Sequence, residues 1–298
     1  MPKGVPNTGY RMTKNRMVLL NKGGNADEFI NTYKHKNDDY EIEDKNYDEN
    51  LSAERIKDRF VVLDYMTNSC VKGNCRSLIV SGPPGLGKSY SVEHILKEWD
   101  SEGDQHEIIK GYIRPTGLYK ALFQHRALGS VLVFDDADNI FNDEVSLNLL
   151  KSVCDTTERR VVSWRSETRM FDSEEAVNIP TSFVFEGTII FITNLDFDKM
   201  IDKGNKIGAH LGALMSRSHY IDLGMKCAKD YLIRIKQVMK DNDVGEMLAG
   251  EKEDVMEFVN NNYTNLRELS IRTIIKLADI RKTSPIQWEK VARITCCR

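Results

Sequence analysis

The chain has 298 residues, of which 41% are hydrophobic, so it is long enough to bury a sizeable core and close to the size of two average domains. Its 42 basic and 45 acidic side chains give a net charge of −3 at pH 7, which excludes binding to nucleic acid through bulk charge but not through a local basic groove. No apolar run reaches the ~20 residues that span a bilayer, and the six scattered cysteines do not form the pattern of a disulfide framework. We therefore expect a globular cytoplasmic protein with reduced thiols and no membrane partner.

The first fifty residues are rich in charge and poor in hydrophobic side chains. Residues 1–24 carry five basic side chains and no acid, whereas residues 38–49 carry seven acids against a single lysine. Segments of this composition bury too little apolar surface to offset the entropy of ordering the chain. We predict that residues 1–50 form a largely disordered tail. The alternative for its basic stretch is contact with phosphates or with an acidic partner.

Hydrophobic residues recur at helical spacing after Leu51. Ile56, Phe60, Val62 and Leu63 follow this pattern, and the Gly73-Asn74 pair is a turn signal. The sequence therefore predicts a helix that ends near residue 73.

A glycine-rich loop between a predicted strand and a predicted helix is the most specific motif of the sequence. Residues 77–81 form a short apolar run of the buried parallel-strand type, and Val92, Ile95 and Leu96 lie on one face of the helix after the loop. Between these elements, residues 82–89 fit the pattern G-x-x-x-x-G-K-[ST]. The glycines let backbone N–H groups wrap around phosphates, and the helix adds the positive end of its dipole. The motif predicts a nucleotide-binding site.

The predicted nucleotide-binding residues form the loop and the start of the helix. They are Gly82, Pro83, Pro84, Gly85, Leu86, Gly87, Lys88, Ser89 and Tyr90. Lys88 supplies a positive charge for the β- and γ-phosphates, and the Ser89 hydroxyl supplies an oxygen ligand for Mg²⁺.

A second apolar run, residues 131–134, ends in three acids, Asp135, Asp136 and Asp138. Acids at the carboxyl end of a parallel strand lie at the edge of the sheet where ligands bind. We expect Asp135 to hold Mg²⁺ through water and Asp136 to orient and polarise the attacking water. The alternative is a strand that ends in a solvated acidic turn, which fits less well in a chain with a phosphate-binding loop.

Three later segments carry further polar candidates. Residues 188–192 predict a third strand, which ends in Thr193-Asn194. The side-chain amide of Asn194 could reach a γ-phosphate or the attacking water. The alternative is that Thr-Asn is only a turn signal. Ser216-Arg217-Ser218 precedes an apparent strand over residues 219–223. Arg272 lies at the start of a predicted helix.

This ordered set of motifs resembles that of the AAA+ ATPases. Residues 82–89 are similar to the Walker A motif, residues 131–138 to Walker B and residues 192–194 to sensor 1. Residues 216–218 are similar to the Ser-Arg-Cys type of arginine finger in clamp-loader-like members, and Arg272 fits the sensor 2 position of the helical lid. The resemblance covers about residues 52–285. Within the family, the chain looks most like uncharacterised AAA+ ATPases of tailed phages, which implies the cytoplasm of a bacterial host.

The resemblance implies an α/β fold, a three-layer sandwich of the P-loop type with a five-stranded parallel sheet and a small C-terminal helical lid. It also implies ATP and Mg²⁺ as cofactors and assembly into a homo-oligomeric ring, usually a hexamer. The implied catalytic residues are Asp136, Asn194, Arg217 and Arg272, and the implied metal ligands are Ser89 and Asp135. Arg217 would act in trans on the γ-phosphate held by a neighbouring subunit. Arg267 is an alternative to Arg272 for the sensor 2 role.

The chain departs from the family pattern at Asp136, where the second Walker B acid is usually Glu. Asp is one methylene shorter, so its carboxylate lies further from the attacking water unless the backbone compensates. Errors of position near 1 Å can reduce a rate about a hundredfold. We expect either slow hydrolysis or an adjusted loop.

Two segments are candidates for contact with a macromolecular substrate. Tyr112 and Ile113 follow a predicted strand over residues 107–110, in the region that faces the central channel of ring ATPases, although Tyr112 could equally be packed at the end of the strand. Residues 159–169 hold four arginines around Trp164, with a predicted hairpin that pairs back through residues 179–185. This group fits two roles. The arginines could contact nucleic-acid phosphates while Trp164 stacks on a base, or the group could form a subunit interface, which we favour.

The C-terminal part, from about Lys226, predicts helices, the longest over residues 266–280. We divide the chain into a tail (1–50), an AAA+ nucleotide-binding domain (51–224) and a helical lid (225–298). The function predicted first is an ATP hydrolase that remodels or translocates DNA or protein, in phage DNA replication or processing. The second is an ATP-gated adaptor or loader with little hydrolysis, acting on protein partners. A small-molecule kinase explains neither Asn194 nor Arg217.

Overall fold

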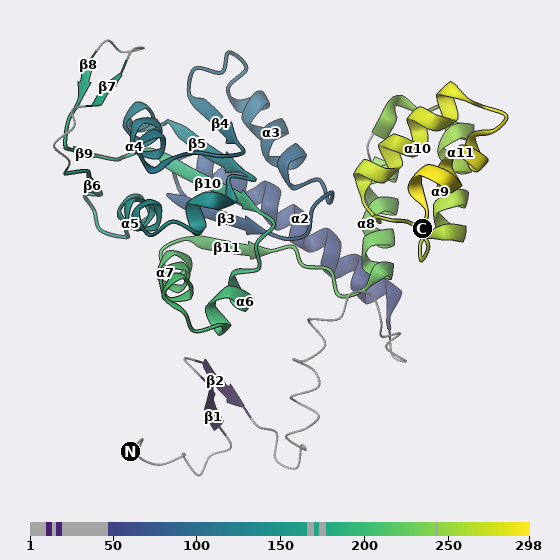
Figure 1. Cartoon of the computed structure of the whole chain (residues 1–298), viewed down its shortest axis with the longest axis horizontal. Coiled ribbons are helices and arrows are strands. Elements are labelled where there is room, and N and C mark those ends of the chain that lie inside the picture. The colour runs from purple at the N-terminus through teal and green to yellow at the C-terminus, as the bar shows by residue number, and fades with distance from the viewer. Residues whose placement is uncertain (1–9, 14–15, 20–46, 166–169, 173–176, 242–243) are drawn as a thin grey trace. The chain divides into compact units, whose positions relative to one another are not determined.

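The computed structural model describes residues 10–13, 16–19, 47–165, 170–172, 177–241 and 244–298 (Figure 1). The chain divides into two units, Met1–Tyr47 and Asp48–Arg298. In the first unit, β1 (Tyr10–Thr13) pairs with β2 (Arg16–Leu19) as antiparallel strands. The remainder of the predicted tail up to residue 46 lies outside the described residues.

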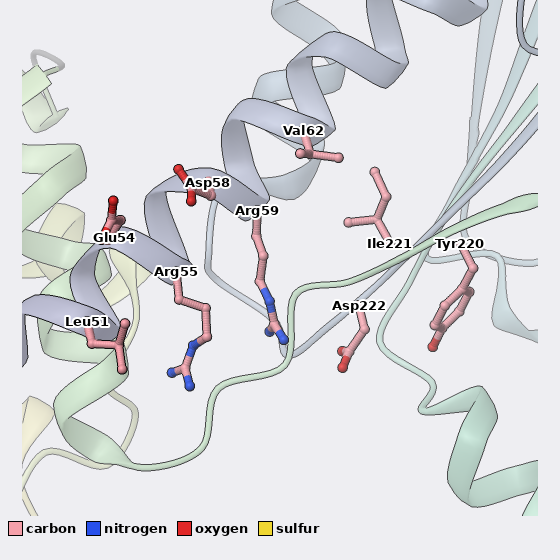
Figure 2. Close-up of a pocket in the computed structure, with 9 residues that line it drawn as sticks. All are labelled: Leu51, Glu54, Arg55, Asp58, Arg59, Val62, Tyr220, Ile221 and Asp222. Atoms are coloured by element: carbon pink, nitrogen blue, oxygen red, sulfur yellow. The ribbon is translucent and has the colours of Figure 1, made fainter. Parts of the chain in front are cut away.

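The second unit begins with the long helix α2 (Glu49–Val71). The Asp48 side chain caps it by accepting hydrogen bonds from the N–H groups of Asn50 and Leu51 at 2.9 and 3.1 Å. Further along, the Arg55 and Arg59 side chains extend from α2 to Asp230 Oδ2 and Gly224 O, each at 2.8 Å (Figure 2). The helix predicted after residue 51 is thus confirmed, and two arginines tie its first half to the chain that leads into the C-terminal helices.

Five parallel strands form the central sheet, in the order β11-β3-β10-β5-β4 (Figure 1). Their bounds are Ser77–Ser81 for β3, His106–Lys110 for β4, Val131–Asp135 for β5, Thr188–Thr193 for β10 and His219–Asp222 for β11. Every residue of β3, β5 and β10 is buried, as their apolar sequences predict. The predicted five-stranded parallel sheet is therefore confirmed.

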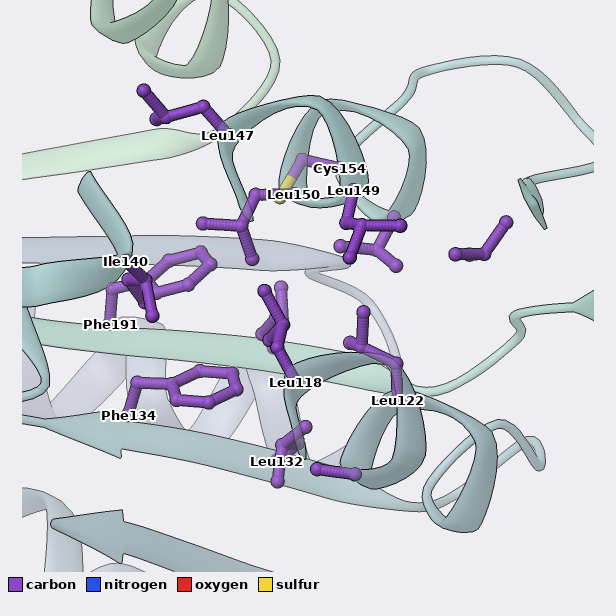
Figure 3. Close-up of a cluster of buried hydrophobic side chains, with 14 of the residues drawn as sticks. Leu118, Leu122, Leu132, Phe134, Ile140, Leu147, Leu149, Leu150, Cys154 and Phe191 are labelled. Carbon is purple, nitrogen blue, oxygen red and sulfur yellow. The ribbon is translucent and has the colours of Figure 1, made fainter. Parts of the chain in front are cut away.

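Helices cover both faces of this sheet, which gives the three layers of the predicted sandwich (Figure 1). The helices after α2 are α3 (Lys88–Trp99), α4 (Pro115–Gln124), α5 (Glu144–Val153), α6 (Phe197–Asp202), α7 (Lys206–Met215) and the short 3₁₀ helix η1 (Asp138–Phe141). The core between the sheet and α4, α5 and α7 is built mainly from leucine and phenylalanine side chains (Figure 3). Phe134 of β5 and Phe191 of β10 stack there with ring centroids 5.7 Å apart. This packing fixes the carboxyl ends of the central strands, which carry the predicted site.

The predicted hairpin is present between α5 and β10. β6 (Val161–Ser163) pairs antiparallel with β9 (Ser182–Val184), and β7 (Met170–Asp172) pairs antiparallel with β8 (Val177–Ile179). Trp164 packs against Tyr119 with tilted rings whose centroids are 5.9 Å apart, and it is half-buried, so this ring is partly used inside the fold. Of the four arginines grouped in the sequence, Arg169 lies outside the described residues.

Arg160 of this group is a buried structural residue. Its guanidinium donates to Val153 O at 2.9 Å and to Gly187 O at 2.8 Å, and it lies 5.1 Å from the ring centroid of Phe185. Only 5% of Arg160 is exposed, whereas the adjacent Arg159 is exposed. Arg160 therefore contributes neither to a nucleic-acid-binding surface nor to a subunit interface, the two roles considered for this arginine cluster.

We expect Arg160→Met to lower the free energy of unfolding by about 2–4 kcal/mol, because two buried carbonyl groups would lose a charged donor. Arg159→Met is the matched control, with an expected change within about 0.5 kcal/mol. Urea denaturation of the two variants measures both values. Equal transition midpoints for the two variants would contradict this assignment.

The C-terminal part is helical, as predicted, with its own core. It consists of α8 (Ala228–Asp241), η2 (Val244–Glu246), α9 (Ala249–Asn262), α10 (Ile271–Thr283) and α11 (Trp288–Cys296). The helix predicted over residues 266–280 is wrong at its start, because Ser270 caps α10 by accepting from Thr273 N at 3.3 Å. Leu266 lies before this cap and forms a β-bridge with Cys297. Among the described residues, none of the helices combines the length and the apolar character that a membrane span needs.

Candidate active site

The predicted glycine-rich loop connects β3 to α3 at the carboxyl edge of the sheet. Gly82 N donates to Thr193 O at the end of β10 at 3.2 Å, which fixes the start of the loop. Gly85 has a φ of +74°, which glycine adopts without strain, and a Cβ at this position would lie 2.5 Å from the Cβ of Ser270. Ile271 N donates to Gly85 O at 2.8 Å. The loop is therefore held directly against the first turn of α10.

Lys88, the first residue of α3, is buried and fully engaged. Its ammonium group donates to Gly82 O at 2.7 Å, to Pro83 O at 2.8 Å and to Asn194 Oδ1 at 2.9 Å. Burial lowers the pKa of Lys88 to about 8, although the nearby carboxylate of Asp136 acts in the opposite direction. A buried ammonium held by two neutral carbonyl oxygens and an amide oxygen is electrostatically suited to exchange them for the anionic oxygens of a phosphate.

Ser89 and Asp135 form a direct pair beside Lys88. The Ser89 hydroxyl donates to Asp135 Oδ1 at 2.8 Å, and Asp135 is 4% exposed at the end of β5. Burial raises the pKa of the Asp135 carboxyl, and the hydrogen bond from Ser89 partly opposes this shift. A hydroxyl and a carboxylate are hard oxygen ligands of the kind that Mg²⁺ prefers, and here they are already adjacent. The donor set therefore fits the predicted metal.

Asp136 has an unusual backbone conformation. Its φ of +54° lies in the left-handed region, which Asp and Asn enter more readily than other non-glycine residues. Asp136 N donates to Ile192 O at 3.0 Å, and Asp136 Oδ1 accepts from Asn194 Nδ2 at 2.7 Å. Asn194 lies between Asp136 and Lys88 and contacts both.

Asp138 is a half-buried carboxylate for which the sequence suggested no role. Its side chain accepts a hydrogen bond from the Thr193 hydroxyl, and the same hydroxyl accepts from Leu195 N at 3.0 Å. Burial raises the pKa of Asp138. The third acid of the predicted strand end therefore ties the segment after β5 to the turn that holds Asn194.

A cavity of about 950 Å³ opens over these groups. The sequence-predicted residues that line it are Pro84, Gly85, Gly87, Lys88, Ser89, Tyr90, Asp136, Asn194 and Arg272. Arg272 comes from the first turn of α10 and is near enough to Lys88 to contribute to lowering its pKa. Arg267, the alternative, is not among the residues that line this cavity, and its N–H donates to Cys296 O at 2.8 Å.

Four other predicted residues contribute to the site without lining the cavity. Gly82 and Pro83 present carbonyl oxygens to Lys88, and the Leu86 side chain is buried in the fold. Asp135 accepts the hydrogen bond from the Ser89 hydroxyl. The sequence prediction thus identified a set that the structure brings together.

The part of the cavity wall that adjoins the glycine loop contains residues that sequence reasoning missed. Phe60 of α2 lies under the guanidinium of Arg234, which is 3.3 Å from the ring centroid, and Arg234 Nε donates to Leu86 O at 3.2 Å. Both residues line the cavity. The helical spacing of Phe60 indicated only a core position, and no motif marked Arg234.

Arg217 is the predicted residue that the structure does not bring to this cavity. Its backbone carbonyl accepts from Ser77 Oγ at 3.2 Å, and its side chain donates to Ala213 O at 2.7 Å. Ser77 is the first residue of β3, whereas the glycine loop follows the last. Arg217 and the cavity therefore lie at opposite ends of the same strand.

A second depression, of about 490 Å³, lies between α2 and the free edge of β11 (Figure 2). Its walls include Leu51, Val62, Tyr220 and Asp222, and it contains none of the predicted site residues. The two arginines in it are engaged in the contacts that anchor α2. We assign this depression no part in the site.

No protein-family model matches the chain. The chain is 38% identical over 242 residues to an uncharacterised 36.7 kDa protein from the nrdC–mobD intergenic region of Enterobacteria phage T4, which covers 80% of this chain and 73% of that protein. Among solved structures, the RuvB Holliday junction branch migration motor of Thermotoga maritima is 15% identical, with a TM-score of 0.43 over 81% of this chain and 68% of that one. NtrX from Brucella abortus in complex with ATP is 14% identical, with a TM-score of 0.42 over 87% of this chain and 56% of that one. The fold described above depends on neither of these structures.

Proposed function

We propose a function from the premise that this chain belongs to the family of the 36.7 kDa phage T4 protein and has the AAA+ fold. In this proposal, the chain binds and hydrolyses ATP between copies of itself. The observation that carries the proposal is the continuous contact from Lys88 through Asn194 to Asp136, over a cavity that Arg272 also lines. A phosphate-binding cation, a polar relay and a carboxylate are the groups that phosphoryl transfer to water requires.

Each of these side chains has a defined part in the proposed reaction. Lys88 exchanges the carbonyl oxygens of the loop for phosphate oxygens, and Ser89 and Asp135 hold Mg²⁺. When bound, the metal neutralises charge on the phosphates. Asp136 accepts a hydrogen bond from the attacking water and polarises it, while Asn194 fixes the orientation of the carboxylate. The lid contributes Arg272 as a cation near the phosphates.

Arg217 completes the site from a neighbouring subunit in this proposal. Because Arg217 lies at the opposite end of β3 from the glycine loop, it has no route to the ATP of its own chain. A second copy can present it, which requires a homo-oligomer, and the AAA+ fold makes a six-membered ring our first expectation. We retain residues 51–224 as the nucleotide-binding domain, residues 225–298 as the lid and residues 1–50 as a tail.

The proposed output is work on a macromolecule in the cytoplasm of an infected bacterium. Tyr112 is 76% exposed, which supports contact with a substrate over packing at the end of β4. The substrate is DNA or a protein partner. Stimulation of ATP hydrolysis by DNA, with a steep decline as salt increases, would select DNA.

A second candidate function is an ATP-gated adaptor or loader with little hydrolysis. The observation that favours it is the Asp136 carboxylate, which is one methylene short and already hydrogen-bonded to Asn194 at 2.7 Å. If that bond persists with ATP present, the carboxylate is not free to polarise water. Steady-state phosphate release separates the two functions, because the adaptor binds ATP but releases little phosphate.

Asp136→Asn provides the direct test of the proposed function. We expect it to bind ATP as the unchanged chain does and to lose at least about 100-fold in turnover, because an amide does not accept a proton as a carboxylate does. Asn tolerates the positive φ at this position, so the fold should be unaffected. Phosphate release and ATP binding by calorimetry measure the two effects. Undiminished turnover would contradict the role given to Asp136, and the ATP-trapped variant can be used to recover the macromolecular partner.

A further inference from the structure

Ser77, the first residue of β3, holds the backbone of Arg217 from inside the fold. Ser77 is 2% exposed, and its hydroxyl donates to Arg217 O at 3.2 Å. The parallel pairing of β3 with β11 brings the two residues together, because Leu78 lies opposite His219 in the register of the two strands. The turn between α7 and β11, which carries Arg217, is therefore tied to an inner strand of the sheet. No motif in the sequence marked Ser77.

The side chain of Arg217 makes a contact of a different kind. Its guanidinium donates to Ala213 O at 2.7 Å, in the last turn of α7. The last carbonyl groups of a helix have no partner within the helix and often accept from a nearby arginine. This acceptor is neutral and Arg217 is only partly buried, so a phosphate oxygen can replace the carbonyl in a stronger, charge-assisted hydrogen bond. The guanidinium can therefore exchange its partner while Ser77 keeps the backbone in place.

The groups around the Ser77 hydroxyl are neutral and largely buried. Cys154, which directly follows α5, is 1% exposed and lies beside the side chains of Ser77 and Ser218. Burial raises the pKa of the Cys154 thiol to about 11, so the thiol is neutral at pH 7, although the two serines act in the opposite direction. Without the Ser77 hydroxyl, Arg217 O would lose this donor in surroundings that offer it little water. We expect the turn that carries Arg217 to shift in response.

We propose that Ser77 is a positioning residue that fixes the backbone of Arg217, so that only the side chain has to move when Arg217 contacts the γ-phosphate on a neighbouring subunit. This inference rests on the proposed function, since it takes Arg217 as the arginine that acts in trans. Its new content is a direction. Ser77 serves the ATP of the neighbour and not the ATP of its own chain, although the far end of β3 leads into the glycine loop of that chain.

The first experiment measures ATP turnover and ADP binding of Ser77→Ala in the full chain. We expect kcat to fall about 10- to 100-fold, because errors of position near 1 Å can reduce a rate about a hundredfold. KM for ATP and the affinity for ADP should stay within about 2-fold, since both depend on the other end of β3. Ser152→Ala is the matched control, because it removes a hydroxyl that donates to Asn148 O within α5, and its kcat should stay within about 2-fold. An unchanged kcat, or a loss of ADP binding, in Ser77→Ala would overturn the proposal.

The second experiment tests the direction by mixing Ser77→Ala subunits with equal amounts of a second variant. With Lys88→Ala, a Ser77→Ala subunit can hold ATP while its neighbour supplies a correctly positioned arginine. Such interfaces are about one quarter of the total after random assembly, so we expect about one quarter of the unchanged turnover. With Arg217→Ala, every arginine present comes from a Ser77→Ala subunit, so turnover should not exceed that of Ser77→Ala alone.

The other outcomes of the mixing experiment overturn the positioning role. If Ser77→Ala damages the ATP site of its own chain, the pattern reverses, and activity returns with Arg217→Ala but not with Lys88→Ala. If the substitution merely weakens the fold, neither mixture recovers, and thermal unfolding shows the loss of stability. The mixture of Arg217→Ala with Lys88→Ala contains no Ser77 variant, so a lack of recovery there counts against the proposed function itself.

Discussion

Lys88→Ala is expected to reduce ATP turnover at least about 1,000-fold, to the background of the assay. The ammonium group of Lys88 lies within the glycine loop, where the Gly82, Pro83 and Asn194 oxygens already position it. An alanine methyl group neither neutralises phosphate charge nor holds the Asn194 amide. Phosphate release at saturating ATP and Mg²⁺ measures the loss, and calorimetry shows whether ATP binding falls with it.

Two controls make the Lys88→Ala result specific to the site. Lys97→Ala removes an exposed lysine from the same helix and should leave turnover within about 2-fold. Thermal unfolding of Lys88→Ala is also needed, because the variant leaves buried carbonyl oxygens without a donor. A folded Lys88→Ala protein that hydrolyses ATP as fast as the unchanged chain would refute the proposed function.

The sequence predicted the sheet and the glycine loop well because these depend on local patterns. Buried parallel strands are continuous apolar runs, and the residues that follow them must be polar if they meet a ligand. Asp135 and Asp136 could therefore be identified from their positions after one such run, and Asn194 from its position after another. Their order in the sequence, together with the loop, was enough to place them at one edge of the sheet.

The parts that the sequence did not predict depend on contacts between segments that are far apart in the chain. Phe60 and Arg234 pack against each other from different helices, and each alone has an ordinary helical spacing. Arg160 differs from its neighbour Arg159 only in the carbonyl groups that surround it after folding. Lys110 of β4 belongs to no motif, and its contacts with Glu93 of α3 at 2.6 Å and with Asp135 at 3.6 Å exist only in the folded chain.

The start of α10 shows a different limit. Leu266 and Leu269 continue the apolar periodicity of the helix backwards, and both are buried. They are buried in a non-helical segment, because Ser270 caps the helix at its N-terminal end and Leu266 pairs with Cys297. The apolar periodicity of a sequence indicates which residues are buried and not which are helical. At this position only the capping Ser270 indicated where the helix begins.

Arg217→Ala is expected to lower turnover about 10³- to 10⁵-fold when all subunits carry it, as loss of an arginine that neutralises γ-phosphate charge does in other phosphoryl-transfer systems. The physical reason is geometric. Arg217 is anchored beside Ser77 and Ala213 at the start of β3, so in the proposed arrangement it would serve the cavity of a neighbouring subunit and not its own. ATP binding, which depends on Lys88 and the loop of the same chain, should change little. Phosphate release and calorimetry on the same preparation separate the two effects.

Mixing Arg217→Ala with Lys88→Ala subunits then tests the arrangement in trans. Each variant alone is inactive. At an interface between an Arg217→Ala subunit that holds ATP and a Lys88→Ala neighbour that supplies the guanidinium, however, every required group is present. With equal amounts and random assembly, such interfaces are about one quarter of the total, so we expect about one quarter of the unchanged turnover. An arginine acting in its own chain would give no recovery at any ratio, because each subunit then lacks one essential group. Turnover by a chain that remains monomeric at saturating ATP and Mg²⁺ would exclude the shared site as well.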